Sequence, residues 1–201
     1  MSKPSKRKHD DTETSSNKKP KSGNKHWALG LLDSINDPEL QVTSDDLCVV
    51  IKDKYPKAAF HYLVLPKDEI SNLKKVNRDH VKLLEHMIEL GKTITEKHID
   101  HNFKFGYHAE ASMHRLHMHI ISDDMNSPCL KNKKHWNTFT TKFFISAEDI
   151  VDDLKENGKV TLPSPEKLKE YLNAPLVCHK CSFKPKNLPD LKKHILTHLK
   201  K

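Results

Sequence analysis

Four potential metal ligands near the carboxy end of the chain constrain its fold most tightly. Two residues separate Cys178 from Cys181, three separate His194 from His198, and twelve lie between the two pairs. Two thiolates from a tight turn and two imidazoles one helical turn apart form a tetrahedral set that suits zinc. The spacing predicts a C2H2 finger holding one structural zinc ion, with all four positions closed. The expected small core of this finger is Phe183, Leu188 and Leu191.

The net charge of +8 is concentrated at the two ends of the chain. Residues 1–25 carry eight basic and three acidic side chains, residues 175–201 carry seven and one, and the remainder carries 20 and 23. Basic ends on a nearly neutral body predict a polyanionic partner contacted at the edges. The alternative is a pair of solvated tails. In the finger, Lys192 and Lys193 are expected to contact the DNA backbone, with little reading of base sequence.

Residues 1–22 are polar and lack apolar periodicity, which predicts a disordered tail. Within this tail, nine residues separate the basic clusters 6–8 and 18–21, a spacing that suits a bipartite nuclear localisation signal. The nuclear interpretation does not exclude a tail that also binds nucleic acid. The sequence has no apolar run of transmembrane length and no signal peptide at its charged start, so we expect a soluble intracellular protein without a membrane partner.

The other two cysteines, Cys48 and Cys129, lie far from each other and from the finger. Such spacing does not form a disulfide framework and predicts two reduced thiols.

Apolar periodicity predicts an α+β domain on an antiparallel sheet. A helix is expected from His26-Trp27 to Asp37-Pro38, a second over 80–97 with Asp79 as its N-cap, and a third over 147–156 capped by Ser146. Strands are expected over 47–51, 59–65, 103–107 and 115–121. The predicted division is a tail over 1–22, a catalytic domain over 23–165 and the finger over 166–201.

The expected strand Arg115–Ile121 carries the most informative pattern. Alternation places Leu116, Met118 and Ile120 on one face, in a core, and Arg115, His117 and His119 on the other. Two imidazoles and a guanidinium on one face of a buried strand are costly unless an anion meets them, and phosphate is a natural guest. Imidazole can also attack phosphorus and form a covalent intermediate.

Two other interpretations of this strand remain open. The row of polar side chains could be the solvated face of an antiparallel sheet. His117 and His119 could also chelate a metal, although the sequence places no carboxylate nearby on that face, because Asp123 and Asp124 lie beyond the strand.

Residues 115–121 resemble the histidine-triad motif, His-φ-His-φ-His-φ-φ with φ apolar, except that Arg115 replaces the first histidine. Segments 50–66, 106–113 and 127–139, together with the following finger, resemble the aprataxin branch of that superfamily, over about residues 24–201. The resemblance implies a histidine-triad-like antiparallel sheet with helices, joined to the finger.

The implied activity is DNA deadenylation. Such an enzyme hydrolyses the 5′-5′ pyrophosphate of adenylated DNA through a histidine–AMP intermediate, releasing AMP and restoring a 5′-phosphate during strand-break repair. It is expected to remove 3′-linked nucleotide caps as well. The implied partner is duplex DNA with adenylated nicks or ends, bound by a monomer that needs no cofactor for catalysis.

The resemblance also implies residue roles. His117 is the nucleophile, His119 stabilises charge on the phosphate, and His108 is a proton donor to the leaving 5′-phosphate. Arg115 is expected to orient His117 through its backbone carbonyl and to keep positive charge near the phosphate, while Trp136 is structural. The expected nucleotide and DNA contacts are Leu31, Ser34, Lys57, His61, Lys67, Asp68, Ser71, Ser112, Arg115, Asn126, Ser127 and Lys134.

Two competing functions remain. A histidine-triad hydrolase of small adenylyl amides or dinucleotide polyphosphates would share the chemistry, but would not explain the finger and the basic ends. A non-catalytic DNA-binding protein would have a degenerate triad because of Arg115.

Overall fold

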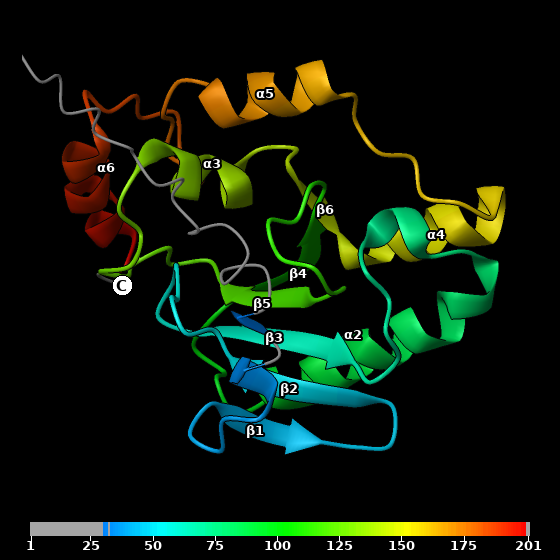
Figure 1. The fold of residues 1–201 in the computed structure, drawn as a ribbon. Coiled ribbons are helices and arrows are strands. Elements are labelled where there is room, and N and C mark those ends of the chain that lie inside the picture. Colours follow the sequence, from blue (N-terminus) through cyan, green and yellow to red (C-terminus); the bar gives the residue numbers. More distant parts are fainter. Residues whose placement is uncertain (1–29, 32, 200–201) are drawn as a thin grey trace, which may run out of the picture.

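The structure, a computed structural model, describes residues 30–31 and 33–199 (Figure 1). Within these residues, six strands form one fully antiparallel sheet in the order β1-β2-β3-β5-β4-β6. The strands are β1 (Gln41–Ser44), β2 (Cys48–Lys52), β3 (His61–Pro66), β4 (Phe103–His108), β5 (Met118–Ser122) and β6 (Phe144–Ser146).

Helices cover both faces of the sheet. The α-helices are α2 (Val81–Thr95), α3 (Lys133–Thr140), α4 (Ala147–Asn157), α5 (Pro165–Asn173) and α6 (Leu188–Ile195), and the 3-10 turns are η1 (Leu73–Lys75), η2 (Arg78–His80) and η3 (Leu196–His198). Helices α2 and α4 bury apolar side chains in the main core against alternate strand residues, among them Val50, Val64, Met118 and Ile120. The intervening strand residues therefore face the opposite side.

The finger shares an apolar core with that opposite side of the sheet. Leu191 and Ile195 of α6 are buried in one cluster with Trp136 and Phe139 of α3 and with Ile121 of β5. In Figure 1 the finger helix α6 lies beside α3, and α5 lies above α3. The finger is thus packed onto the sheet domain rather than separated from it.

Most expected elements are confirmed, but the strand expected over 115–121 begins only at Met118. The antiparallel register would place Leu116 opposite Pro66, which has no N–H to donate. The N–H of Leu116 instead donates to the carbonyl of Ile70 at 2.6 Å. The expected alternation of faces nevertheless holds, because Leu116 is buried in the main core.

The expected N-cap at Asp79 is wrong. Asn77 accepts the N–H of Asp79 and forms a capping box with His80, so the turn η2 begins before α2 and contains Asp79. Ser146 does occupy the N-cap position of α4, but its hydroxyl donates to the carboxylate of Glu148 at 2.7 Å. The strands β1 and β6 and the helices α3 and α5 were not expected.

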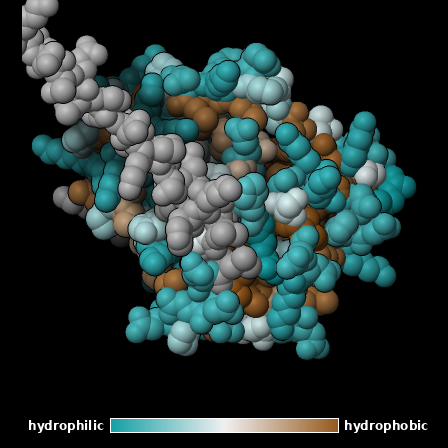
Figure 2. Space-filling view, in the orientation of Figure 1, coloured by the Kyte–Doolittle hydropathy of each residue, from teal (hydrophilic) through white to brown (hydrophobic). Residues whose placement is uncertain are grey.

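Residues 30–31 and 33–35 are helical, and this helix ends before Asp37-Pro38 as expected. Its expected start at His26-Trp27, the tail 1–22 and both basic clusters lie outside the described residues. None of the described helices is long and apolar enough to cross a bilayer. Figure 2 shows the molecule from the same side as Figure 1. Hydrophilic side chains cover much of the face in view, with hydrophobic side chains gathered between them.

Candidate active site

Three buried histidines and the half-buried His108 gather on the sheet face opposite α2. His61 comes from β3, His108 from β4 and His119 from β5, while His117 directly precedes β5. The ring centroid of His119 lies 4.4 Å from that of His108, 4.9 Å from that of His117 and 5.2 Å from that of His61. The antiparallel order β3-β5-β4 thus places His119 at the centre of the cluster.

His117 is held in one tautomer by the backbone. Its Nδ1 lies 2.7 Å from the carbonyl oxygen of Arg115, and a carbonyl can only accept, so Nδ1 carries the proton. Burial lowers the pKa of His117 below its usual range. The ring is therefore neutral at physiological pH, and its Nε2 keeps a free lone pair.

His61 fixes the tautomer of His119 in the same way. The backbone N–H of Lys57 donates to Nδ1 of His61 at 3.2 Å, so Nε2 of His61 carries the proton. This Nε2 lies 2.9 Å from Nδ1 of His119, which accepts. His119 consequently holds its own proton on Nε2, as a hydrogen-bond donor.

Two of these imidazoles have an atom without a partner. Nε2 of His119 and Nε2 of His108 are buried and have no hydrogen-bond partner among the described residues. Burial and the neighbouring imidazoles hold the pKa values of His108 and His119 well below the usual range, so both rings are neutral. Unpaired buried polar atoms are costly, and a bound oxyanion would satisfy them.

One phenylalanine ring packs against three of the four histidines. The ring of Phe139 in α3 lies edge-on to those of His108, His119 and His61, with centroids 4.6, 5.2 and 5.3 Å away. The sequence does not single out Phe139, because no helix was expected over its segment. Its helical spacing from Trp136 is the signal that could have identified it.

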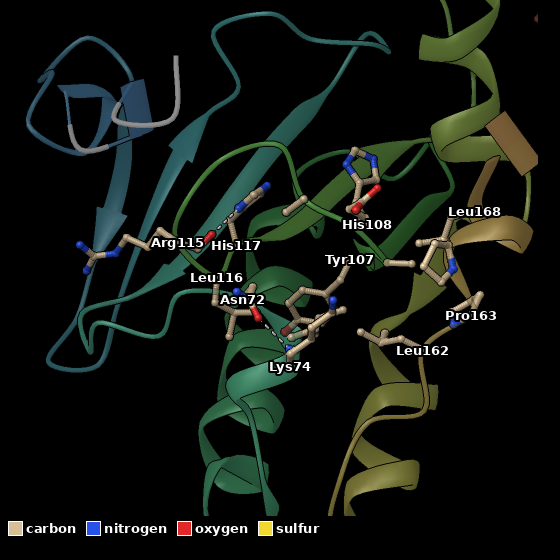
Figure 3. Close-up of a pocket in the computed structure, with 15 residues that line it drawn as sticks. Asn72, Lys74, Tyr107, His108, Arg115, Leu116, His117, Leu162, Pro163 and Leu168 are labelled. Carbon is tan, nitrogen blue, oxygen red and sulfur yellow. Dashed lines mark hydrogen bonds between the residues drawn. The ribbon is translucent and has the colours of Figure 1, made fainter. Parts of the chain in front are cut away.

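A cavity of about 170 Å³ opens beside His108 and His117 (Figure 3). Its walls combine apolar side chains from 162–168 with the charged side chains Lys74, Glu110 and Arg115. The cavity therefore suits a ligand with both a polar and an apolar surface.

The guanidinium of Arg115 was expected to keep positive charge near the phosphate, but in the structure it is bonded to the backbone. Nη2 donates to the carbonyl oxygens of Pro66 and Lys67, at 2.9 and 3.0 Å. In Figure 3 its side chain points away from His117. The expected backbone geometry is present, since the carbonyl of Arg115 accepts from His117.

Asp53, from another segment, brings to this face a carboxylate that was not expected from the sequence. Its Oδ2 lies 3.5 Å from Nδ1 of His61, and Asp53, His61 and His119 could together approach one ion. However, Nδ1 and Nε2 of His61 and Nδ1 of His119 are already engaged in the hydrogen bonds above. The donor atoms therefore fit a relay between imidazoles better than a metal site.

Of the residues expected near the nucleotide, His61 belongs to this cluster and Lys57 contacts it through its backbone N–H. Leu31 is buried against Val49, Ile51, Leu63 and Leu65 on the histidine side of the sheet. Ser34 donates its hydroxyl to the carbonyl of Gly30 at 2.9 Å. Burial lowers the pKa of the Lys57 ammonium, which donates to the carbonyl of Tyr55.

The residues expected to touch DNA mostly lie at the surface. Those with exposed side chains are Lys67, Asp68, Ser71, Ser112, Asn126 and Lys134. Ser127 differs, because it is buried and its hydroxyl donates to the carbonyl of Pro56 at 2.6 Å. The N–H of Cys129 donates to the same hydroxyl at 3.1 Å. The Ser127 hydroxyl thus makes both of these hydrogen bonds inside the protein.

The finger brings its four expected ligands together. Sγ of Cys178 lies 3.4 Å from Nε2 of His198, and Sγ of Cys181 lies 3.2 Å from Nε2 of His194. The two imidazole Nε2 atoms are 3.2 Å apart. These distances match the edges of a tetrahedron around zinc, with Zn–S near ~2.3 Å and Zn–N near ~2.0 Å. The expected core is present too, with Leu191 buried and Phe183 and Leu188 packed against it.

Contacts from the finger correct one expectation about DNA. Lys192 donates its ammonium to the carbonyl oxygens of Ser127 and Leu130, at 2.8 and 3.3 Å. Trp136 donates its indole N–H to the carbonyl of Val177, which confirms a structural position. Lys192 is thus a contact to the sheet domain, whereas Lys193 is exposed.

Comparisons with known proteins agree with this geometry. Residues 26–135 match the family model for scavenger mRNA decapping enzyme C-term binding, and residues 140–201 match the C2HE / C2H2 / C2HC zinc-binding finger. The chain is 49% identical over 175 residues to aprataxin of Ciona intestinalis, covering 85% of this chain and 46% of the relative. It is 31% identical over 208 residues to an aprataxin-like protein of Saccharomyces cerevisiae, covering 84% and 94%.

The fold is shared with a solved structure described as aprataxin ortholog Hnt3 in complex with DNA, with a TM-score of 0.69. The two chains are 22% identical, and the match covers 88% of this chain and 94% of that chain. The present chain spans about half the length of the animal aprataxins it matches first, with 46%, 54% and 55% covered. The aligned identity, the histidine cluster and the zinc-binding finger lead to one conclusion: the chain belongs to the aprataxin family of histidine-triad proteins.

Proposed function

We propose that this chain is a DNA deadenylase, which hydrolyses the 5′-5′ pyrophosphate of adenylated DNA and restores a 5′-phosphate. One observation carries the proposal. In a chain of the aprataxin family, the buried neutral His117 donates Nδ1–H to the carbonyl of Arg115, and so keeps an Nε2 lone pair for attack. A relative's structure in complex with DNA supports the choice of substrate.

In the first step, Nε2 of His117 forms a bond to the adenylate phosphorus, and the bond from phosphorus to the bridging oxygen breaks. The DNA 5′-phosphate leaves with that oxygen and its electron pair. The His117 ring becomes cationic, and its hydrogen bond to the carbonyl of Arg115 strengthens as the charge develops. Water then attacks phosphorus, the N–P bond breaks, AMP leaves and one proton is released to solvent.

His119 and His108 act on the oxygens in this proposal. The Nε2–H of His119 donates to a non-bridging oxygen as negative charge develops there. His108 is neutral before substrate binds, so it cannot act as a strong acid in the free protein. The arriving phosphates raise the pKa of His108, because an opposite charge favours the protonated ring. His108 can then protonate the leaving phosphate.

The leaving DNA end would occupy the cavity beside His108 and His117, with Lys74 at its wall. The adenosine would lie toward Leu31 and Ser34. The exposed set around Lys67 and Lys134, together with Lys193 of the finger, would contact the DNA. We extend the activity to 3′-linked nucleotide caps, since the same N–P chemistry applies.

We further propose a nuclear monomer in which the finger holds one structural zinc ion. Four protein ligands complete the tetrahedron and leave no open position for catalysis. The domain division after residues 22 and 165 stays part of this proposal.

The test compares turnover of adenylated nicked DNA with turnover of adenosine 5′-phosphoramidate under matched conditions. A larger kcat/KM for the DNA supports the proposal. A larger value for the phosphoramidate would favour a small-molecule hydrolase. Tight DNA binding without turnover of either substrate would favour a non-catalytic DNA-binding protein.

A further inference from the structure

A chain of hydrogen bonds connects the zinc finger to the histidine cluster. Lys192 of α6 donates to the carbonyl of Ser127 at 2.8 Å, and the hydroxyl of Ser127 donates to the carbonyl of Pro56 at 2.6 Å. The peptide unit that begins with this carbonyl ends with the N–H of Lys57. That N–H donates to Nδ1 of His61 at 3.2 Å.

The two ends of the Pro56–Lys57 peptide unit therefore have different partners. Its carbonyl faces the loop fixed by the finger, and its N–H faces the imidazole next to His119. Since a peptide unit is planar and rigid, fixing the carbonyl also fixes the direction of the N–H. This N–H, directed at Nδ1, keeps the proton of His61 on Nε2 although the carboxylate of Asp53 lies 3.5 Å from Nδ1, and His61 in turn sets the tautomer of His119.

We propose that Lys192 is a positioning residue for the deadenylation reaction: through Ser127 and the Pro56–Lys57 peptide it fixes the tautomers of His61 and His119. The finger thereby has a second role beside any contact with DNA. This inference rests on the proposed function, but the tautomers of His61 and His119 can be measured by NMR whether or not the protein turns over a substrate.

The surroundings of Lys192 support this role. Its ammonium is partly buried and donates to a second carbonyl, that of Leu130, at 3.3 Å. The same loop is braced elsewhere, because Nε2 of His179 donates to the carbonyl of Asp123 at 2.6 Å and the ammonium of Lys180 pairs with the carboxylate of Asp123 at 3.0 Å. Loss of Lys192 should therefore loosen the loop locally and leave the finger docked.

The experiment compares Lys192→Met, Lys192→Arg and Ser127→Ala in the zinc-loaded full chain. The control is Lys169→Met, the same change at an exposed lysine of α5. The substrate is adenosine 5′-phosphoramidate, so that DNA binding does not contribute. Nitrogen NMR of the imidazoles reports the tautomers of His61 and His119, and thermal melting reports folding.

We expect Lys192→Met and Ser127→Ala to lower kcat about tenfold, the effect of losing a hydrogen bond to a charged or buried group, with KM within about twofold. Both should convert the single NMR tautomers of His61 and His119 into mixtures. Lys192→Arg should restore kcat and the tautomers, because guanidinium also donates to two carbonyls. The control should match the wild type.

Because Lys192 and Ser127 act through one peptide unit, the double variant should lose no more kcat than the worse single variant. Unchanged tautomers in a folded Lys192→Met protein would overturn the inference, as would a lower melting temperature with unchanged kcat. If the wild type shows no turnover of either substrate, the proposed function fails, while the NMR comparison still decides the positioning role.

Discussion

Nε2 of His61 lies 2.9 Å from Nδ1 of His119, so that two imidazoles 58 residues apart share one hydrogen bond between adjacent strands. This bond assigns the proton of His119 to Nε2, the atom that has no partner among residues 30–31 and 33–199. In the proposed reaction, His61 thus orients the donor of His119 through a hydrogen bond between the two imidazoles.

His61→Phe should lower the single-turnover rate by about 5- to 150-fold, because an unpaired buried acceptor costs about 1–3 kcal/mol. His61→Gln should retain more activity, since its amide N–H can still donate to His119. Rapid-quench deadenylation of nicked DNA measures both variants. Equal rates for Phe and Gln, with both proteins folded, would show that the donated hydrogen bond does not matter.

Arg115→His and Arg115→Ala should each change the rate by less than about tenfold. The carbonyl that accepts from His117 remains in both variants, and the guanidinium is occupied by the carbonyls of Pro66 and Lys67. Loss of these partly exposed bonds should lower the free energy of unfolding by roughly 1 kcal/mol. A loss of rate far above tenfold in Arg115→Ala alone would assign the guanidinium to the phosphate instead.

The free energy of unfolding should decrease as the pH falls below about 6.5. Burial lowers the pKa of His61 to about 4, so between these values the unfolded chain binds a proton that the folded protein does not. Stability is therefore full above pH 6.5 and declines toward pH 4. Urea unfolding at several pH values, with zinc present, should show a shallower decline for His61→Gln than for the wild type. Identical slopes would contradict a buried neutral His61.

The sequence predicted the sheet because β2 and β3 are rich in apolar residues and β4 carries an aromatic side chain at every second position. It predicted α2 because apolar residues recur there at helical spacing. It did not predict the start of β5, because the missing N–H that ends the pairing belongs to Pro66 on the neighbouring strand. The short strands β1 and β6 have too few residues for a period to be visible.

The candidate site was predictable where one segment carries the chemistry, as in 115–121 and in the finger ligands. The hydrogen bonds from Lys57 to His61 and from His61 to His119 were not predictable. They depend on how separate segments pair in the sheet, which the sequence of each segment does not show. For the same reason Asp53 was overlooked, and Lys192 was assigned to DNA although its ammonium contacts the sheet domain.

Lys193→Met should reduce the salt dependence of DNA binding, with a log–log slope smaller by about 0.9 for each lost phosphate contact. Lys193 is the exposed neighbour of Lys192, whose ammonium is bound to two carbonyls. Lys192→Met should leave the slope unchanged. Fluorescence anisotropy with a nicked duplex at several salt concentrations measures both. A smaller slope for Lys192→Met alone would reverse the two assignments.

Trapping AMP on the protein tests the central claim most directly. Nicked DNA carrying a labelled 5′-adenylate should, after rapid acid-free quenching with denaturant, leave label on the peptide that contains His117. His117→Ala should fold, bind the DNA and retain no label, because no other imidazole of the cluster has its Nδ1 proton fixed by the carbonyl of Arg115. Label on His117 that forms and decays at the rate of turnover is the predicted result. Turnover by the wild type without a labelled intermediate, or wild-type turnover by His117→Ala, would contradict the account.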